Sequence, residues 1–259
     1  GIINLINITS SNYLEPAGMF NIFRLYRNSF SGLRKEVWWL ALVTFVNRAG
    51  TMVIPFLSLY LTASLGFTLK DVGWVLSAFG LGSVVGSWLG GKLTDRIGAY
   101  PVMLWSLLLS GILFIMIQYI ESFWGFCAGI FTVMLVADTF RPALFVAIND
   151  YCLPENRTRS VSLIRLAINL GFSFGPAVGG LIIANVSYSG LFWIDGITCV
   201  MAALVFVAVL PRKERKVAEA EEAIQPNVKS PYRDKVYLLF VFILILIGFS
   251  FLQYFSTIP

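Results

Sequence analysis

The sequence contains no histidine, and only 13% of its 259 residues are charged. Without histidine the chain cannot form an imidazole metal site or a Ser-His-Asp or Cys-His catalytic group. The three cysteines are far apart and form no CxxC pair, which disfavours a disulfide framework or a zinc site. No phosphate-binding glycine loop, nucleotide fingerprint or catalytic pair of carboxylates is present. The sequence therefore predicts no enzyme, no bound cofactor or metal, and no nucleic-acid partner.

Apolar residues take the place of the missing charges, since 58% of the chain is hydrophobic. This composition is typical of a protein that exposes apolar side chains to a lipid bilayer. Apolar runs of about 20–25 residues follow one another, and at 1.5 Å rise per residue each covers a hydrocarbon core of about 30 Å. Barrel strands would be shorter and would alternate in polarity. The sequence predicts an all-α membrane protein with spans at 38–62, 72–91, 101–120, 123–147, 160–184, 190–210 and 236–258.

Basic residues gather in the loops on one side of these spans. Fifteen of them lie on that side, whereas the opposite loops hold only Lys70. Positively charged loops stay in the cytoplasm, so we expect a cytoplasmic N-terminus and an inner (plasma) membrane location. The fifteen are Arg24, Arg27, Arg34, Lys35, Lys92, Arg96, Arg157, Arg159, Arg212, Lys213, Arg215, Lys216, Lys229, Arg233 and Lys235.

The spacing of the spans predicts four parts. These are a cytoplasmic N-terminal segment (1–37), a six-helix bundle (38–210), a cytoplasmic linker (211–235) and a seventh membrane helix (236–259). Met19 is a candidate start residue, because the chain does not begin with methionine. A seventh helix after a long linker is expected to open a second bundle, so the chain is interpreted as a truncated piece of a larger protein.

One motif follows the second span and consists of Gly91, Leu93, Asp95, Arg96 and Gly98. Glycine permits the close approach and left-handed backbone of a tight turn, and the Asp-Arg pair can form a charge network at the cytoplasmic surface. The pattern resembles the G-x-L-x-D-R-x-G signature that the major facilitator superfamily carries in the loop between helices two and three. The cations that usually follow this signature are missing here. The resemblance implies a gating motif in loop 2–3.

A second motif lies in the fifth span, at Gly171, Gly175, Pro176, Gly179 and Gly180. It resembles the G-x3-G-P-x2-G-G motif in helix five of that superfamily's proton-coupled antiporters, which are mostly drug exporters. Proline removes a helix hydrogen bond, and glycines let another helix approach closely. The resemblance implies a contact with a helix of the second bundle. The alternative is a plain glycine packing face.

The second span repeats glycine every four residues, at Gly82, Gly86 and Gly90. Such a stripe permits tight contact between membrane helices. In the superfamily that the chain resembles, helix two meets the second bundle and slides during transport. Packing within the first bundle explains the stripe equally well.

Charged residues within the spans are the candidate cavity residues. An intramembrane charge costs at least about 2.5 kcal/mol, so it is expected to face a cavity or a partner. Counting along the spans places Arg48 and Asp138 at one depth and Arg141 with Arg165 at another. Arg48, Asp138 and Arg141 either line a substrate or proton cavity or form a structural ion-pair cluster, and a structural role is favoured for Arg165. Asp195 is expected to reach the outer membrane interface.

The resemblance implies a six-helix N-terminal bundle of two inverted three-helix repeats, followed by the first helix of a second bundle. It implies alternating-access transport of a small molecule, with a proton gradient as the energy source. The helix-five motif favours a drug-efflux antiporter, whose partners are substrate, protons, lipid and the missing C-terminal bundle. A metabolite or sugar carrier, or a truncated fragment that does not transport, remains open. The substrate cannot be named, because this fold serves many cargos.

Overall fold

The computed structural model describes residues 30–185, 187–212 and 234–257, and every element in these ranges is helical. The chain forms two units, Gly1–Lys213 and Glu214–Pro259. The second unit contains α12 (Lys235–Thr257). The first contains α3 (Lys35–Ala49), α4 (Val53–Ala63), α5 (Leu69–Ile97), α6 (Ala99–Ile117), α7 (Phe123–Ala137), α8 (Phe140–Tyr151), the 3₁₀ turn η1 (Pro154–Asn156), α9 (Arg157–Asn185) and α10 (Ser189–Val209).

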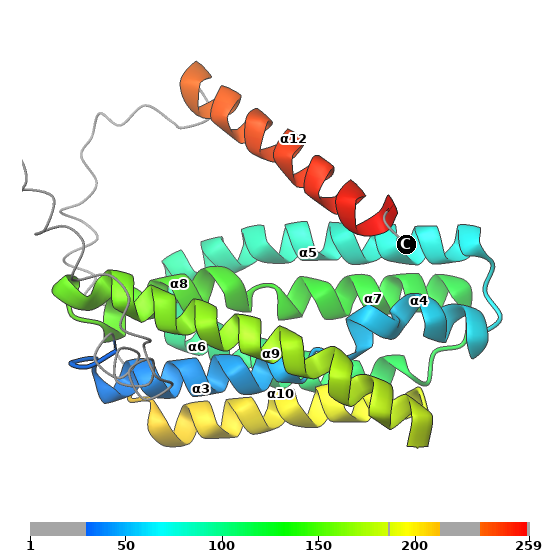
Figure 1. Cartoon of the computed structure of the whole chain (residues 1–259), viewed down its shortest axis with the longest axis horizontal. Helices are drawn as coiled ribbons and strands as arrows, with labels where there is room; N and C mark the ends of the chain where they lie inside the picture. Colours follow the sequence, from blue (N-terminus) through cyan, green and yellow to red (C-terminus); the bar gives the residue numbers. More distant parts are fainter. Residues whose placement is uncertain (1–29, 186, 213–233, 258–259) are drawn as a thin grey trace, which may run out of the picture. The chain divides into compact units, whose positions relative to one another are not determined.

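Six helical segments of the first unit are long and apolar enough to cross a membrane, and they run roughly along one axis (Figure 1). They confirm the first six predicted spans and the all-α membrane fold. The seventh predicted run falls on α12. Met19, most of the N-terminal segment and most of the linker lie outside the described residues. The six segments are Lys35–Ala63, Leu69–Ile97, Ala99–Ile117, Phe123–Tyr151, Pro154–Asn185 and Ser189–Val209.

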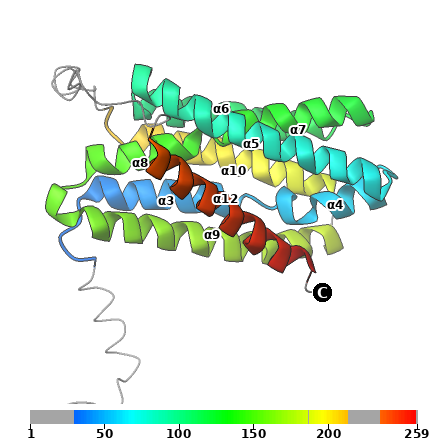
Figure 2. The same ribbon diagram turned by 90° about the horizontal axis from the view of Figure 1, so that it is seen from above.

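The first and fourth spans are each broken in the middle, whereas the sequence predicted continuous helices. Figure 2 shows α3 and α4 joined by a short non-helical turn, and Figure 1 shows a similar break between α7 and α8. Pro55 and Pro142 are the third residues of α4 and α8. A proline cannot donate a helix hydrogen bond and clashes with the carbonyl four residues before it. Each proline therefore stops the preceding helix from continuing through the break.

The glycine stripe of α5 packs against α7 (Figure 1). A Cβ placed on Gly82 would lie 2.5 Å from the carbonyl oxygen of Phe131, and one on Gly90 would lie 2.6 Å from Cα of Thr139. Between them, Gly86 faces the backbone of Leu135. Of the two interpretations of this stripe, close packing inside the first bundle is therefore the one that the contacts bear out.

Of the helix-five glycines, Gly171 and Gly179 face the first span of their own bundle, as the alternative of a glycine packing face expects. A Cβ on Gly171 would lie 2.5 Å from Cβ of Arg48, and one on Gly179 would lie 2.9 Å from Cε2 of Phe56. Helix α9 thus packs its small face on the broken first span, as α5 packs on the broken fourth span. Both contacts need glycine because backbone atoms, which cannot move aside, form part of the opposing surface.

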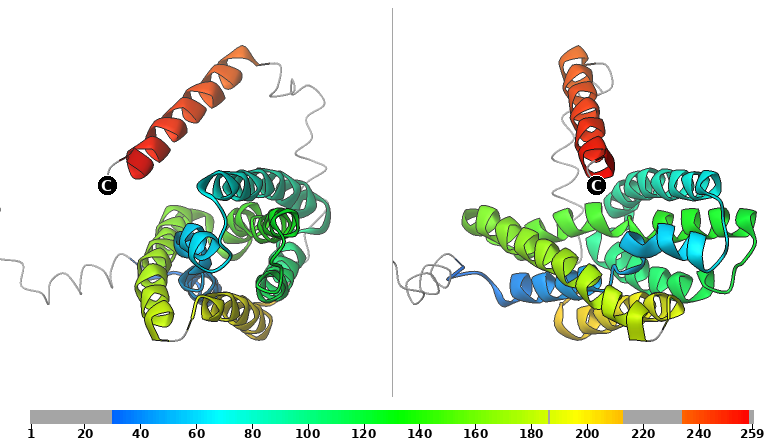
Figure 3. Two further views of the ribbon diagram at one scale, coloured as in Figure 1. Left: turned by 90° about the vertical axis from the view of Figure 1, so that its right-hand side faces the viewer. Right: turned by 45° about the vertical axis from the view of Figure 1, so that its right-hand side comes forward.

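Two apolar clusters fill the bundle, one toward each end. Leu40, Met103, Phe140 and Phe206 are among the buried side chains of the first cluster. Leu57, Phe126, Ile130 and Phe192 belong to the second. The end-on view in Figure 3, left, shows the helices that surround these clusters. The breaks at Gly50–Met52 and Asp138–Thr139 fall between the clusters in each span, and polar side chains gather at this level.

Thr68 begins α5 with a complete capping box. Its hydroxyl accepts a hydrogen bond from the backbone N–H of Asp71 (3.3 Å), and the Asp71 carboxylate accepts one from the backbone N–H of Thr68 (3.1 Å). We expect Thr68→Ala to lower the free energy of unfolding by about 0.5–2 kcal/mol, with Thr68→Ser close to wild type. Titration with SDS in mixed micelles measures this change. Thr62→Ala, which removes an exposed hydroxyl inside α4, is the control and should have a smaller effect.

Candidate functional site

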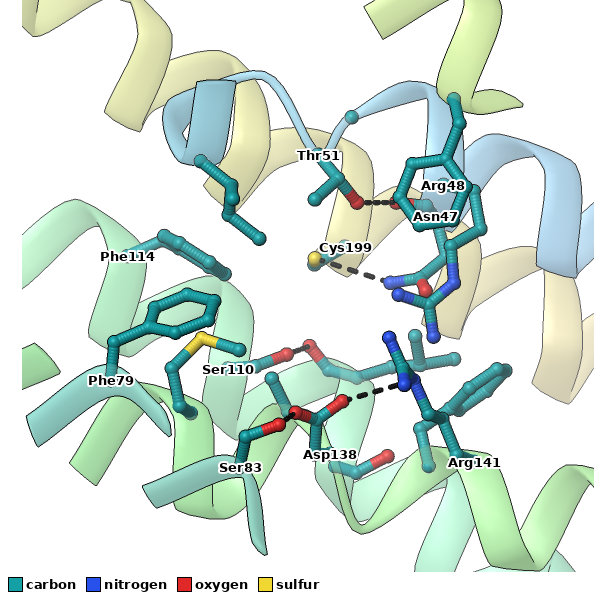
Figure 4. Close-up of a pocket in the computed structure, with 18 residues that line it drawn as sticks. Asn47, Arg48, Thr51, Phe79, Ser83, Ser110, Phe114, Asp138, Arg141 and Cys199 are labelled. Carbon is teal, nitrogen blue, oxygen red and sulfur yellow. Dashed lines mark hydrogen bonds and ion pairs between the residues drawn. The ribbon is translucent and has the colours of Figure 1, made fainter. Parts of the chain in front are cut away.

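A polar cavity lies at the level of the two helix breaks (Figure 4). Its volume is about 100 Å³, where a single water needs about 10–15 Å³, so a small organic group fits. Residues from α3 through α10 line it, those of the two helix breaks included. Its polar and charged lining residues are Asn47, Arg48, Thr51, Ser83, Ser106, Ser110, Asp138, Arg141 and Cys199, and its aromatic ones are Phe79, Phe114, Phe140 and Phe172.

Asp138 is the carboxylate of this cavity and lies where α7 ends. The C-terminal end of a helix is electronegative and disfavours a carboxylate, so Asp138 needs positive or donating neighbours. Arg141 supplies the charge, with 3.2 Å between its Nε and Oδ1 of Asp138, and the Ser83 hydroxyl donates to Oδ2. The side chain of Asp138 is buried, whereas that of Arg141 is 54% exposed. The two side chains form an ion pair in which the more exposed one, Arg141, faces the cavity.

Arg48 lies in the last turn of α3, just before the first helix break. Its guanidinium carbon lies 5.7 Å from the ring centroid of Phe172, a distance that permits a cation–π contact. Within the described part of the chain, no carboxylate lies within ion-pair distance of Arg48. Figure 4 shows its guanidinium pointing toward the space that Arg141 and Asp138 also face. The electronegative C-terminal end of α3 favours a cation at this position.

Asp195 does not reach the membrane interface, contrary to expectation. It is 1% exposed, and its carboxylate accepts hydrogen bonds from the backbone N–H groups of Met52 (2.9 and 3.1 Å) and Val53 (2.9 Å). It therefore caps the N-terminal end of α4 from another helix, where the helix dipole favours a negative charge. A lone carboxylate in an apolar run is the one sequence signal of this role. The sequence does not indicate which backbone groups the carboxylate binds.

The residues of the first motif do not form a loop, which corrects the predicted loop 2–3. Gly91, Leu93, Asp95 and Arg96 lie on the last turns of α5, and the connection to α6 consists of Gly98 alone. Gly98 has φ +87°, so its role in a left-handed turn is confirmed, whereas a Cβ on Gly91 would meet nothing within 4 Å. The helix continues through the motif because it contains no proline and no residue before Gly98 leaves helical geometry.

Only the charged candidates meet at the cavity. Arg48, Asp138 and Arg141 all line it, so residues that were expected at two depths open on one cavity. Arg165 is exposed and does not line the cavity.

Neither glycine motif contributes a lining residue. In the second motif Gly171, Gly175 and Gly179 are buried, Gly180 is partly buried, and Pro176 lies exposed inside α9.

Six helical spans around a polar, charged cavity define a multi-pass membrane protein with a small cavity inside its bundle. The chain belongs to the Major Facilitator Superfamily, whose sequence profile matches residues 40–259.

Among curated proteins, the chain is similar to Quinolone resistance protein NorA of Staphylococcus aureus, with 24% identity over 227 residues, 87% of this chain and 58% of NorA. It is also 24% identical to the uncharacterized MFS-type transporter YceJ of Bacillus subtilis, over 73% of this chain and 48% of YceJ. The Escherichia coli inner membrane transport protein YajR matches at 24% identity over 74% of this chain and 42% of YajR. The chain thus spans about half the length of these relatives. None of them is named as an enzyme.

Two solved structures share the fold. The chain resembles the POT family transporter PepTSo with a TM-score of 0.61 and 17% identity, covering 85% of this chain and 48% of PepTSo. An auto-inhibited POT family peptide transporter gives a TM-score of 0.60 and 21% identity, over 85% of this chain and 47% of that protein. At these identities the likeness concerns the fold alone.

Proposed function

We propose that this chain forms half of an alternating-access transporter that exchanges a small molecule for protons. The cavity at the helix breaks is the observation that carries the proposal. Charged side chains halfway along an apolar bundle cost free energy, and by default they mark a functional site. The relatives named as transporters, and NorA as a quinolone resistance protein, support export of a drug-like substrate. A second six-helix bundle is the proposed partner that completes the path, since the relatives are about twice as long.

The predicted parts become the proposed domains: segment 1–37, bundle 38–210, linker 211–235 and a first helix of the second bundle at 236–259. The basic residues at one end of the described bundle support a cytoplasmic N-terminus. The inner membrane is the proposed location, in line with the name of YajR. Arg34, Lys35, Lys92, Arg96, Arg157, Arg159 and Arg212 all lie at that end, whereas Lys70 lies at the start of α5.

The cavity ion pair and both glycine motifs have proposed roles. Asp138 is the proton site, and Arg141 competes with the proton for its carboxylate. The helix-five glycines hold α9 against the backbone at Arg48 and so position that arginine. At the basic end, the exposed Leu93 and Arg96 of the first motif would meet the second bundle and act in gating.

Proton release on substrate binding tests this function. We expect a quinolone added to the detergent-purified chain in weak buffer at acidic pH, where a proton competes with Arg141 for the Asp138 carboxylate, to release up to one proton per bound molecule, because drug and proton share Asp138. Asp138→Asn should bind the drug with that release abolished, and Asp71→Asn, an exposed carboxylate in a capping box, is the control that should retain it. A pH-indicator dye measures the release.

Two results would contradict the proposal in different ways. Equal proton release from the Asp138→Asn variant would remove Asp138 from the proton site. Quinolone binding without any proton release would remove the antiport mechanism. A chain that binds no quinolone but binds a sugar or a metabolite would favour the alternative carrier of the same superfamily.

A further inference from the structure

The charge balance of the cavity indicates the chemistry of its ligand. Its lining contains two guanidinium groups, on Arg48 and Arg141, and one carboxylate, on Asp138. Arg141 and Asp138 neutralise each other in an ion pair. The other buried carboxylate nearby, Asp195, does not line the cavity and is held by two backbone N–H groups. One positive charge, that of Arg48, is therefore left without a counter-charge among the residues that line this space.

An uncompensated arginine inside a membrane bundle is unfavourable unless something supplies the opposite charge. The Phe172 ring, at 5.7 Å, offers only a weak electrostatic partner. A guanidinium presents a planar fork of N–H donors that matches a carboxylate with two parallel hydrogen bonds. The opposite part of the cavity is aromatic, with Phe79 and Phe114 directed toward it in Figure 4.

We propose that Arg48 binds an anionic group of the substrate, and that the substrate class is a small aromatic carboxylate or a larger molecule that bears one. The carboxylate lies on the Arg48 guanidinium and the aromatic part contacts the phenylalanines, which leaves Asp138 to the proton-coupled step of the proposed function. This inference rests on the proposed transport function, because it assigns the chemistry of that function's substrate. It requires only binding, whereas the transport proposal also requires that binding is coupled to a proton.

Equilibrium binding to the detergent-purified chain tests the inference with three probes of similar shape and different charge. These are para-fluorobenzoate, which is anionic, para-fluorobenzamide, which is neutral, and para-fluorobenzylamine, which is cationic at neutral pH. Fluorine NMR titration gives a dissociation constant for each. We expect the carboxylate to bind at least about tenfold more tightly than the amide, and the amine to bind most weakly.

Three variants identify the arginine responsible. Arg48→Gln should remove the preference for carboxylate over amide while amide binding stays measurable, which also shows that the bundle is folded. Arg48→Lys should keep part of the preference, because it keeps the charge but not the planar fork. Arg165→Gln, the matched control, removes an arginine at membrane depth that does not line the cavity and should leave all three constants unchanged.

The inference is overturned if the amine binds best, if carboxylate and amide bind equally to the wild-type chain, or if Arg48→Gln keeps the carboxylate preference. These outcomes are separate from the proton measurement. Tight carboxylate binding without proton release would contradict the antiport proposal alone, whereas proton release with a cationic substrate would contradict the assignment of Arg48 alone.

Discussion

Replacing Gly86 by alanine is expected to destabilise the bundle by about 1–3 kcal/mol or more, although alanine favours helices. The added Cβ would press on the backbone of Leu135, whose carbonyl carbon and Cα would lie 2.9 Å away. Backbone atoms cannot turn aside as a flexible side chain does, so α5 and α7 would have to separate. Unfolding by SDS in mixed micelles, followed by circular dichroism, measures the loss.

Two glycines of the same helix provide matched controls. A Cβ on Gly80 or Gly91 would meet no atom within 4 Å. Alanine at these positions is therefore expected to leave stability unchanged or to raise it by up to about 1 kcal/mol, the difference in helix propensity. If Gly86→Ala were as stable as Gly80→Ala, the tight contact between α5 and α7 would be wrong.

Replacing Asp195 by leucine is expected to have a comparable effect, a loss of about 2–5 kcal/mol. The substitution leaves the backbone N–H groups of Met52 and Val53 without their acceptor in a buried site, and each unsatisfied group costs about 1–3 kcal/mol. It also removes the negative charge from the N-terminal end of α4. The same SDS titration measures the loss.

Asparagine separates the two contributions at this position. Asp195→Asn keeps an acceptor for the N–H groups but removes the charge, so its stability should fall between wild type and Asp195→Leu. Since α4 begins a few residues after Arg48, Asp195→Leu should also weaken para-fluorobenzoate binding. A leucine variant as stable as wild type would show that the carboxylate does not hold the first helix break together.

The candidate cavity residues could be named from the sequence because intramembrane charges are rare and costly. Arg48, Asp138 and Arg141 stood out in apolar runs for that reason, and all three line the cavity. The sequence did not show that one cavity joins them, because counting along a continuous helix ignores the break that precedes α8. The same reasoning misplaced Asp195, since a charge in a span can face an interface or a buried partner and the local sequence is the same in both cases.

Length, hydropathy and short motifs are local properties, and they alone determined the six spans, the helical class and the superfamily. Which faces meet is a property of residues far apart in the chain, so it had to come from the tertiary structure. Packing decided that the glycines of α5 face α7 and those of α9 face the broken first span. It also decided that Asp195 caps α4, and that Arg48 is left as the one cavity charge whose counter-charge the lining does not supply.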